Sequence, residues 1–179
     1  MIKHIIATAA LASIAAIANA AEPVSAAPFS APGAVYIGAD LGTTQIHGAA
    51  DGHRTSYGGF VGYTLNPNFA VEAGFGRLYS WSGYGANERG NQASLSVLGS
   101  VPIASNLSLY GRLGVNQISM RGEVPMPGNS KYIVKDDTTR ALLGLGLNYK
   151  LSENVSTRIE VQRPGLDLTN YKVGVSYAF

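Results

Sequence analysis

The last nine residues of the chain, YKVGVSYAF (Tyr171 to Phe179), alternate between two kinds of side chain. Apolar and aromatic residues occupy every second position, and small or polar residues stand between them. Successive side chains of a β-strand point to opposite faces, so this period of two predicts a strand with a different environment on each side. An untethered chain end is usually polar, whereas this one is apolar to its last residue, and we expect it to be held within the fold.

The first 20 residues have the pattern of a secretory signal peptide. Lys3 precedes an apolar run from Ile5 to Ile17, and Ala18-Asn19-Ala20 matches an A-x-A cleavage site. A transmembrane anchor is the alternative, but the run is too short to span a bilayer and ends in small residues. We therefore expect residues 1–20 to be removed on export. Residues 21–33, which are rich in proline and alanine and lack periodicity, are expected to form a mobile lead-in.

Composition and charge exclude several classes of protein. Hydrophobic residues make up 46% of the chain and charged residues 13%, about half of the usual charged share of a soluble globular protein. Once Lys3 is removed, 12 basic residues face 11 acidic ones, a balance that argues against nucleic acid as a partner. The absence of cysteine excludes disulfides and thiolate metal sites. No long apolar run follows residue 20, which excludes a helical membrane protein and leaves the apolar surface distributed by alternation.

The alternation of the last nine residues is repeated along the rest of the chain. In each repeat, apolar residues occupy one face, and glycine, serine, asparagine, alanine or isolated charges dominate the other. The segments have the length of transmembrane β-strands, about ten residues. The eight segments are 35–41, 57–65, 69–76, 93–101, 107–116, 141–149, 155–162 and 171–179.

The connections between these segments alternate in length. Three are short, at 66–68, 104–106 and 152–154, and four are long, at 43–54, 79–91, 119–138 and about 164–168. Short turns at one end and long loops at the other are typical of outer-membrane β-barrels. The sequence therefore predicts an all-β protein, an eight-stranded antiparallel up-and-down transmembrane β-barrel over residues 34–179.

The polar face separates a membrane barrel from a soluble one. Alternation by itself also fits a soluble barrel of the lipocalin kind, with its apolar face turned inward around a ligand. A water-facing surface would be dense in lysine and glutamate, whereas here small residues dominate and suit a crowded interior. Aromatic residues near the ends of the apolar face match the girdles at the two membrane interfaces. They are Tyr57, Tyr63, Phe69, Phe75, Tyr149, Tyr171, Tyr177 and Phe179.

Four stretches carry a family resemblance: GGFVGYTLNPNFAVEAGF (58–75), LYGRLGV (109–115), STRIEVQR (156–163) and YKVGVSYAF (171–179). Together with their order, they resemble the transmembrane domain of the OmpA family and the related small barrels of the OmpX and Ail kind. The resemblance covers nearly all of residues 34–179. It implies a location in the bacterial outer membrane, in contact with the lipids of that membrane.

The resemblance also suggests why the chain ends as it does. In such proteins a last strand that ends in phenylalanine is recognised by the outer-membrane assembly machinery, so Tyr177 and Phe179 are the expected assembly signal. Many OmpA-family proteins continue into a periplasmic peptidoglycan-binding domain. This sequence stops with the barrel, and peptidoglycan anchoring is not expected.

Six charged residues fall on the inward face of the predicted strands. Each lies about four to seven residues from the short-turn end of its strand, near the middle of the barrel. Three acids and three bases at a similar depth are expected to form one paired cluster, because an unpaired charge there would be costly. Glu72 and Arg112 are the expected central pair. The cluster consists of Asp40, Glu72, Arg112, Arg158, Glu160 and Lys172.

Two roles are open for this cluster. An eight-stranded barrel is only wide enough for side chains to fill its interior, so the charges can form a plug that holds the barrel shut. Alternatively, a change of partners among the charges can open a narrow water path, as has been proposed for barrels that this one resembles.

The long loops contain residue types that are enriched at binding hot spots. Tyr79, Trp81, Tyr84 and Arg89 cluster in the second long loop, and Tyr132 lies among charged residues in the third. These five residues are candidate contacts for host or surface ligands. The alternative is that Tyr79 and Trp81 only anchor the outer rim of the barrel.

The positions of the histidines argue against an enzyme. Some small outer-membrane barrels process lipid A with histidine and serine at the lipid-facing rim, but His47 and His53 fall in the first long loop. With Asp51 they could ligate a metal, although loop histidines are more often solvated. We therefore expect no enzymatic activity, no cofactor and no metal. The expected role is structural or surface interaction, in envelope integrity, adhesion or host-factor resistance, and a narrow pore of low conductance gated by interior salt bridges is the alternative.

Overall fold

The computed structural model describes residues 32–46, 52–83, 86–126, 130–165 and 168–179. These residues form eight β-strands. Among them, no helix is long and apolar enough to cross a membrane. The expected signal peptide and most of the expected lead-in lie outside the described residues.

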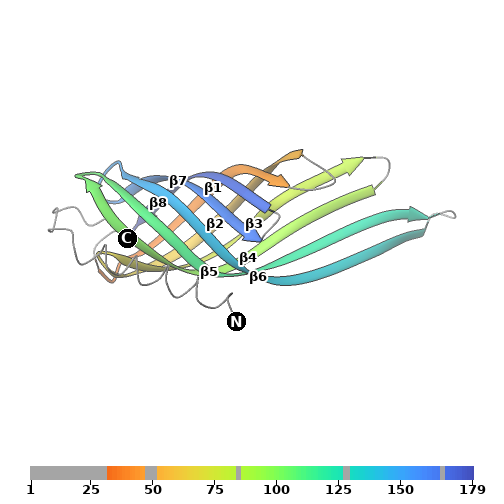
Figure 1. Ribbon diagram of the computed structural model, residues 1–179, viewed down its shortest axis with the longest axis horizontal. Coiled ribbons are helices and arrows are strands. Elements are labelled where there is room, and N and C mark those ends of the chain that lie inside the picture. Colours follow the sequence, from red (N-terminus) through yellow and green to blue (C-terminus); the bar gives the residue numbers. More distant parts are fainter. Residues whose placement is uncertain (1–31, 47–51, 84–85, 127–129, 166–167) are drawn as a thin grey trace, which may run out of the picture.

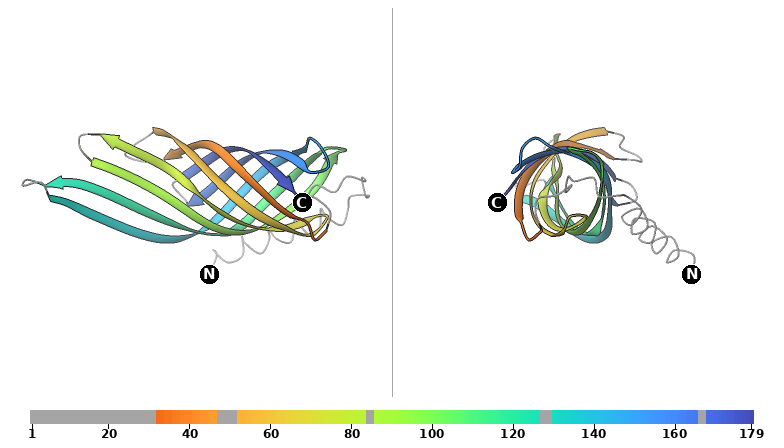
Figure 2. Two further views of the ribbon diagram at one scale, coloured as in Figure 1. Left: turned by 180° about the vertical axis from the view of Figure 1, so that it is seen from behind. Right: turned by 90° about the vertical axis from the view of Figure 1, so that its left-hand side faces the viewer.

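The strands follow one another around a single closed barrel (Figure 1). Each strand pairs antiparallel with the next, and the last strand pairs with the first, as the end-on view of Figure 2 shows. The eight-stranded antiparallel barrel predicted from the sequence is therefore confirmed. The strands are β1 (Val35–Ile46), β2 (Gly52–Asn66), β3 (Phe69–Gly83), β4 (Ala86–Ala104), β5 (Leu107–Met126), β6 (Ser130–Lys150), β7 (Val155–Gly165) and β8 (Leu168–Ala178).

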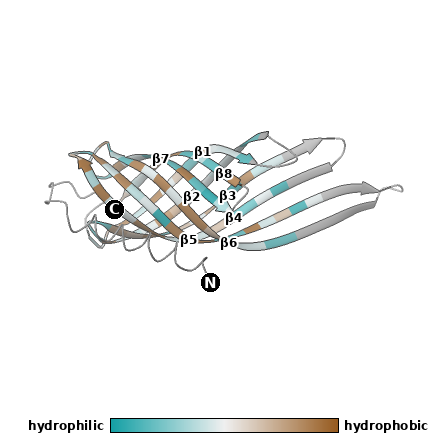
Figure 3. Ribbon diagram, in the orientation of Figure 1, coloured by the Kyte–Doolittle hydropathy of each residue, from teal (hydrophilic) through white to brown (hydrophobic). Residues whose placement is uncertain are grey.

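Alternating side chains give the barrel wall two different faces. The outward face is apolar, and Leu41 and Phe75 on it are 67% and 69% exposed. In Figure 3, hydrophobic and hydrophilic residues alternate along the visible strands of the barrel wall. The inward face carries small and polar residues, and glycine makes room there for inward rings. A Cβ at Gly62 would collide with the ring of Tyr36, so glycine is needed where this tyrosine crosses the interior.

The last strand closes the barrel. β8 pairs with β1 along its whole length, and the backbone N–H of Phe179 donates to the carbonyl of Val35 at 3.0 Å. The apolar terminus is thus part of the barrel wall, as its alternation predicts. The Phe179 ring is 71% exposed on the outer surface, with its centroid 5.2 Å from that of Tyr177. Closure pairs the backbone N–H and C=O groups of β1 and β8 with each other. In the hydrocarbon of a membrane such groups have no water to bind, so this pairing is required.

The prediction of long loops is wrong for two of the four segments. Every described residue of 79–91 and 119–138 belongs to β3, β4, β5 or β6. Their sequences lack the continuous apolar face of the membrane-facing segments. The backbone pairing of neighbouring strands therefore continues beyond the point at which the hydrophobic pattern ends.

These four strands continue beyond the closed barrel as a sheet of their own. Pairing of β2 with β3 ends at Tyr57 and Arg77, and pairing of β6 with β7 ends at Leu143 and Arg163. Beyond these points β3 to β6 remain paired with one another, and Figure 1 shows them reaching past the other strands. We call this part the extended sheet. It comprises residues 78–83, 86–91, 119–126 and 130–142.

A β-bulge in β3 marks the base of the extended sheet. The register with β4 shifts between Arg77 and Tyr79, and Leu78 and Tyr79 are both buried, at 1% and 5% exposure. They pack with Ile118 of β5 in a small apolar cluster. The prediction that Tyr79 is an exposed loop contact is therefore wrong. An extra residue in one strand moves the following side chains to the other face, which alternation alone cannot reveal.

Candidate functional site

All six inward charges predicted from the sequence meet inside the barrel. They come from β1, β3, β5, β7 and β8, so closure of the barrel brings them together. Their contacts form one chain in which positive and negative charges alternate, and we call it the charge ladder. In order of contact, its members are Lys172, Asp40, Arg158, Glu72, Arg112 and Glu160.

Glu72 is at the centre of the ladder, between two arginines. Arg112 Nη2 lies 2.7 Å from Glu72 Oε1, and Arg158 Nη1 lies 2.7 Å from Glu72 Oε2. The central pair of Glu72 and Arg112 expected from the sequence is thus present. Arg112 also binds Glu160, with 2.6 Å between Nε and Oε1 and 3.1 Å between Nη2 and Oε2. Each of these guanidinium groups therefore contacts a carboxylate through more than one nitrogen, which restrains its orientation.

Asp40 joins the other end of the ladder. Lys172 Nζ lies 3.1 Å from Asp40 Oδ1, and Arg158 Nη2 lies 3.8 Å from Asp40 Oδ2. Arg158 thus bridges two carboxylates from different strands. The lysine end is the more open one, because the Lys172 side chain is 14% exposed and that of Asp40 is 5% exposed.

Two inward tyrosines donate to the central carboxylates. The Tyr110 hydroxyl donates to Glu160 Oε2 at 2.9 Å, and the Tyr36 hydroxyl donates to Glu72 Oε2 at 3.3 Å. Both tyrosine side chains lie almost entirely inside the barrel. Alternation places them on the inward face, but their contacts with the ladder depend on which strands meet across the interior.

The two arginines also have neutral partners. Arg112 Nη1 donates to Ser96 Oγ at 2.7 Å. The guanidinium of Arg158 stacks on Phe60, with 3.5 Å between its Cζ atom and the ring centroid. A cation over an aromatic face is attracted by the ring quadrupole. The serine thus accepts from an N–H group of Arg112, and the phenylalanine covers the flat face of the Arg158 guanidinium.

The ladder is electrically neutral and nearly buried. Removing charges from water is costly, and mutual attraction compensates only when each charge has close partners and good hydrogen bonds. Here every charge touches at least one of opposite sign. Taking away one partner of such a buried pair typically costs about 3–5 kcal/mol. The ladder therefore ties five strands together across the interior.

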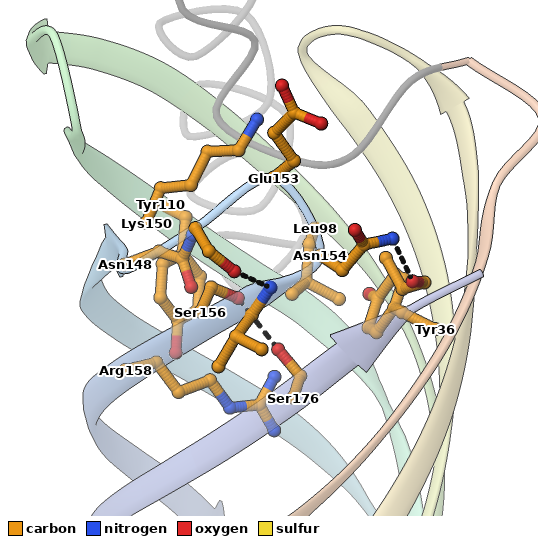
Figure 4. A pocket seen from close by; sticks show the side chains of 13 residues that line it. Tyr36, Leu98, Tyr110, Asn148, Lys150, Glu153, Asn154, Ser156, Arg158 and Ser176 are labelled. Atoms are coloured by element: carbon orange, nitrogen blue, oxygen red, sulfur yellow. Dashed lines mark hydrogen bonds between the residues drawn. The ribbon is translucent and has the colours of Figure 1, made fainter.

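Two small cavities lie on either side of the ladder. The cavity toward the short turns has a volume of about 30 Å³, and Tyr36, Tyr110 and Arg158 help to line it (Figure 4). The cavity on the other side has a volume of about 20 Å³, and Glu72, Arg112 and Arg158 help to line it. A buried water needs about 10–15 Å³, so each cavity has room for one or two waters. Arg158 contributes to both cavities and stands between them.

The remaining candidate contacts are distributed over the extended sheet. Arg89 is exposed on β4, and Trp81 and Tyr132 are positions of β3 and β6. Tyr84 lies outside the described residues. Arg89, Trp81 and Tyr132 belong to paired strands rather than to loops, so pairing decides which residues become their neighbours.

Strand register places three basic residues in one row across the extended sheet. Arg89 of β4 is directly opposite Arg121 of β5, and Arg121 is directly opposite Lys135 of β6. We call these three residues the cation row. Neighbouring strands lie about 4.7–4.9 Å apart, and like charges directly opposite each other destabilise a sheet. Of the three residues, only Arg89 is a contact predicted from the sequence, because they are distant in the chain and only strand pairing joins them.

The described residues show no metal site. His53 lies on β2 rather than in a loop, whereas His47 and Asp51 lie outside the described residues. Within the described part of the chain, no group of three metal-binding side chains comes together.

Residues 7–179 match the family model of the outer membrane protein beta-barrel domain. The chain belongs to this family. It is accordingly a protein of the bacterial outer membrane. A comparison with curated protein sequences found no match.

Solved structures of small outer-membrane barrels share the fold. Neisserial surface protein A aligns with a TM-score of 0.64 and 16% identity, over 81% of this chain and 97% of that one. Ail of Yersinia pestis aligns with a TM-score of 0.60 and 18% identity, over 84% and 100% of the two chains. The N-terminal β-barrel domain of OprF from Pseudomonas aeruginosa aligns with a TM-score of 0.59 and 19% identity, over 80% and 97%. The resemblance inferred from the sequence is confirmed at the level of family and fold.

Membership in this family orients the barrel. Barrels of the outer membrane have short turns toward the periplasm and longer segments toward the outside of the cell. The turns around 66–68, 104–106 and 151–154 then face the periplasm, together with the end of β8. The extended sheet, with its cation row, faces outward from the cell.

Proposed function

We propose that this protein is a non-enzymatic surface-interaction protein whose extended sheet binds polyanions, such as sulfated or phosphorylated glycans, outside the cell. The observation that carries the proposal is the cation row. Arg89 and Arg121 are exposed, and the register places Lys135 directly opposite Arg121. A row of like charges costs stability unless an anion bridges it, so its presence in a surface sheet favours a role in binding.

The geometry of the row suits an extended anion that crosses the strands. The three residues stand at paired positions of neighbouring strands, whose backbones lie about 4.7–4.9 Å apart. Arginine binds phosphate and sulfate-like groups through two parallel N–H donors, which adds orientation to charge. A ligand with several anionic groups along a chain can therefore contact the whole row at once.

A structural relative supports the chemistry. Ail of Yersinia pestis has been crystallised in complex with sucrose octasulfate, a heparin analogue that carries many sulfate groups. Sulfated glycans are therefore suitable probes for this chain. Binding of this kind is consistent with the expected roles in adhesion or in resistance to host factors. Tyr177 and Phe179 remain proposed as the assembly signal.

The test is a variant that removes the row, Arg89→Gln with Arg121→Gln and Lys135→Gln. Protein purified from outer membranes is bound to immobilised heparin and eluted with a salt gradient. Exposed ion contacts are worth about 0.2–1 kcal/mol each, so we expect affinity to fall about tenfold. Elution then moves to lower salt, because exposed charge interactions are screened by ions.

The matched control removes the same charge outside the row. It replaces Arg54, Arg77 and Lys150 with glutamine, and it is expected to elute like the unmodified protein. Heat-dependent gel mobility shows that both variants are folded. Equal weakening in both variants would indicate a response to net charge alone and would contradict the proposal, as would unchanged elution of the row variant.

A second function, a gated pore, is favoured by the two cavities beside the charge ladder. Both cavities have room for water, and Arg158 of the ladder helps to line each of them. We expect the variant Glu72→Ala with Arg112→Ala to alter single-channel openings of the purified protein in a planar bilayer. Discrete openings that change in the variant would support the gate. If correctly folded wild-type protein shows no channel openings, the pore is contradicted and the ladder is a plug.

A further inference from the structure

We propose that a cluster of apolar side chains closes the extracellular mouth of the barrel and acts as the outer gate of its interior. The cluster consists of Leu78, Tyr79 and Ile118, with Met120 and Leu168 packed against it. We call it the apolar seal. The seal and the charge ladder are then two barriers in series between the outside of the cell and the periplasm.

The seal joins strands from different sides of the barrel. Leu78 and Tyr79 belong to β3, and Ile118 and Met120 belong to β5, whereas Leu168 belongs to β8. In the ring of strands, β8 is three steps away from β3 and three steps away from β5. Side chains from strands so far apart in the ring meet across the interior, so the seal spans the bore of the barrel.

The β-bulge in β3 turns the chain toward the interior at this level. Leu78 and Tyr79 are adjacent in the chain, yet both are buried. The Thr44 hydroxyl of β1 donates to the Leu78 carbonyl at 2.8 Å, although β1 and β3 are not neighbouring strands. A bulge re-aims side chains that would otherwise alternate between the two faces. It therefore gives the seal one more side chain than regular alternation would supply.

A layer of buried amide side chains lies between the seal and the ladder. Asn116 Oδ1, Gln162 Oε1 and Asn170 Nδ2 are buried and have no hydrogen-bond partner among the described residues. Buried polar groups require partners, so this layer has donors and acceptors for water that reaches it. Two strands show the same inward order of ladder, amide layer and seal: Arg112, Asn116 and Ile118 on β5, and Lys172, Asn170 and Leu168 on β8.

The cavity on the extracellular side of the ladder lies between the two barriers. Its lining includes Leu78 of the seal, Gln162 of the amide layer and Glu72 of the ladder. Water in this polar space can form hydrogen bonds, whereas water in an apolar constriction loses them, and hydrophobic constrictions in channels close by dewetting. The seal therefore controls access from outside to a polar compartment that the ladder closes from below.

The test uses a single thiol placed in the amide layer. The chain has no cysteine, so Ser56→Cys introduces the only thiol. Ser56 is buried, and its hydroxyl donates to Asn170 Oδ1 at 2.9 Å, which places it in this layer. Purified protein in micelles is treated with a small charged methanethiosulfonate reagent, and labelling is followed by mass spectrometry. We expect slow labelling, because the seal and the ladder exclude the reagent from the two ends.

The variant Leu78→Ala with Ile118→Ala opens the seal in the Ser56→Cys protein. We expect labelling to become at least about tenfold faster, because its rate follows the population of open molecules. Leu98→Ala is the matched control. Leu98 is as buried as Leu78, but it lines the cavity on the periplasmic side of the ladder. An equal increase in the control, or unchanged labelling in the seal variant, would overturn the proposal.

A second variant separates an apolar gate from a purely steric plug. Leu78→Asn keeps the branched shape of leucine but replaces its methyl groups with polar atoms, and we expect it to accelerate labelling as well. It also replaces the double variant if heat-dependent gel mobility shows that the double variant does not fold. Slow labelling of Leu78→Asn would contradict a gate that closes by excluding water. Labelling reports access rather than ion flow, so a barrel without channel openings can still confirm the seal.

Discussion

The closed barrel and the extended sheet share four strands, yet charged residues are arranged in opposite ways in the two regions. Inside the barrel, the charge ladder alternates in sign, and every member touches an opposite charge. In the extended sheet, the cation row sets like charges opposite each other. Burial makes an unpaired charge costly, whereas water and salt screen an exposed one. The ladder thus contributes to the integrity of the barrel, whereas the like charges of the row are the basis of the proposed anion binding.

The two regions also differ in how their strands are bordered. In the closed barrel every strand has two neighbours, and the sheet has no free edge there. In the extended sheet, β3 and β6 have lost their outer neighbours, β2 and β7. Removing a side chain should therefore have larger consequences in the barrel than in the extended sheet.

The largest expected effect is that of Arg112→Ala in the ladder. The change leaves Glu160 without its guanidinium partner and leaves Glu72 with Arg158 as its remaining arginine. We expect the free energy of unfolding to fall by about 3–5 kcal/mol, because a buried carboxylate loses its pair. Urea unfolding of the refolded protein in micelles, followed by gel mobility, measures it. A loss below about 1 kcal/mol, the range of surface ion pairs, would show that the ladder is solvated rather than buried.

An intermediate effect is expected for Tyr79→Ala at the boundary between the two regions. The Tyr79 side chain packs with Leu78 and Ile118, and its removal opens a cavity under the extended sheet. We expect a loss of roughly 3 kcal/mol in the free energy of unfolding, at the lower end for buried aromatic residues. Arg89→Ala, an exposed change in the same sheet, serves as the control. A loss within about 0.5 kcal/mol would instead fit the exposed position expected from the sequence.

The smallest expected effect has the opposite sign. Arg121→Ala removes the middle of the cation row and with it two repulsive neighbours, Arg89 and Lys135. We expect the free energy of unfolding to rise by about 0.2–1 kcal/mol at low salt, the range of cross-strand pairs. The gain should shrink in 1 M salt, where charges are screened beyond about 3 Å. Destabilisation at both salt concentrations would show that the row does not act through repulsion.

Alternation in the sequence accounts for most of the fold. It predicts the inward position of Tyr36 and the outward position of Leu41, and it places the six ladder residues on one face. It fails at Tyr79, where a bulge inserts a residue, and in 119–138, where paired strands carry no apolar face. In both places the hydrophobic pattern is a poor guide, because register and backbone pairing decide the structure.

The sequence by itself determined the eight segments, the two faces of the wall and the presence of matched charges inside it. These properties are local, since a period of two needs only neighbouring residues to be read. The tertiary structure alone decided the order of charges in the ladder and the alignment of the cation row. Each of these joins strands that are distant in the chain. Their contacts depend on closure and register, which arise from pairing along whole strands rather than from any single segment.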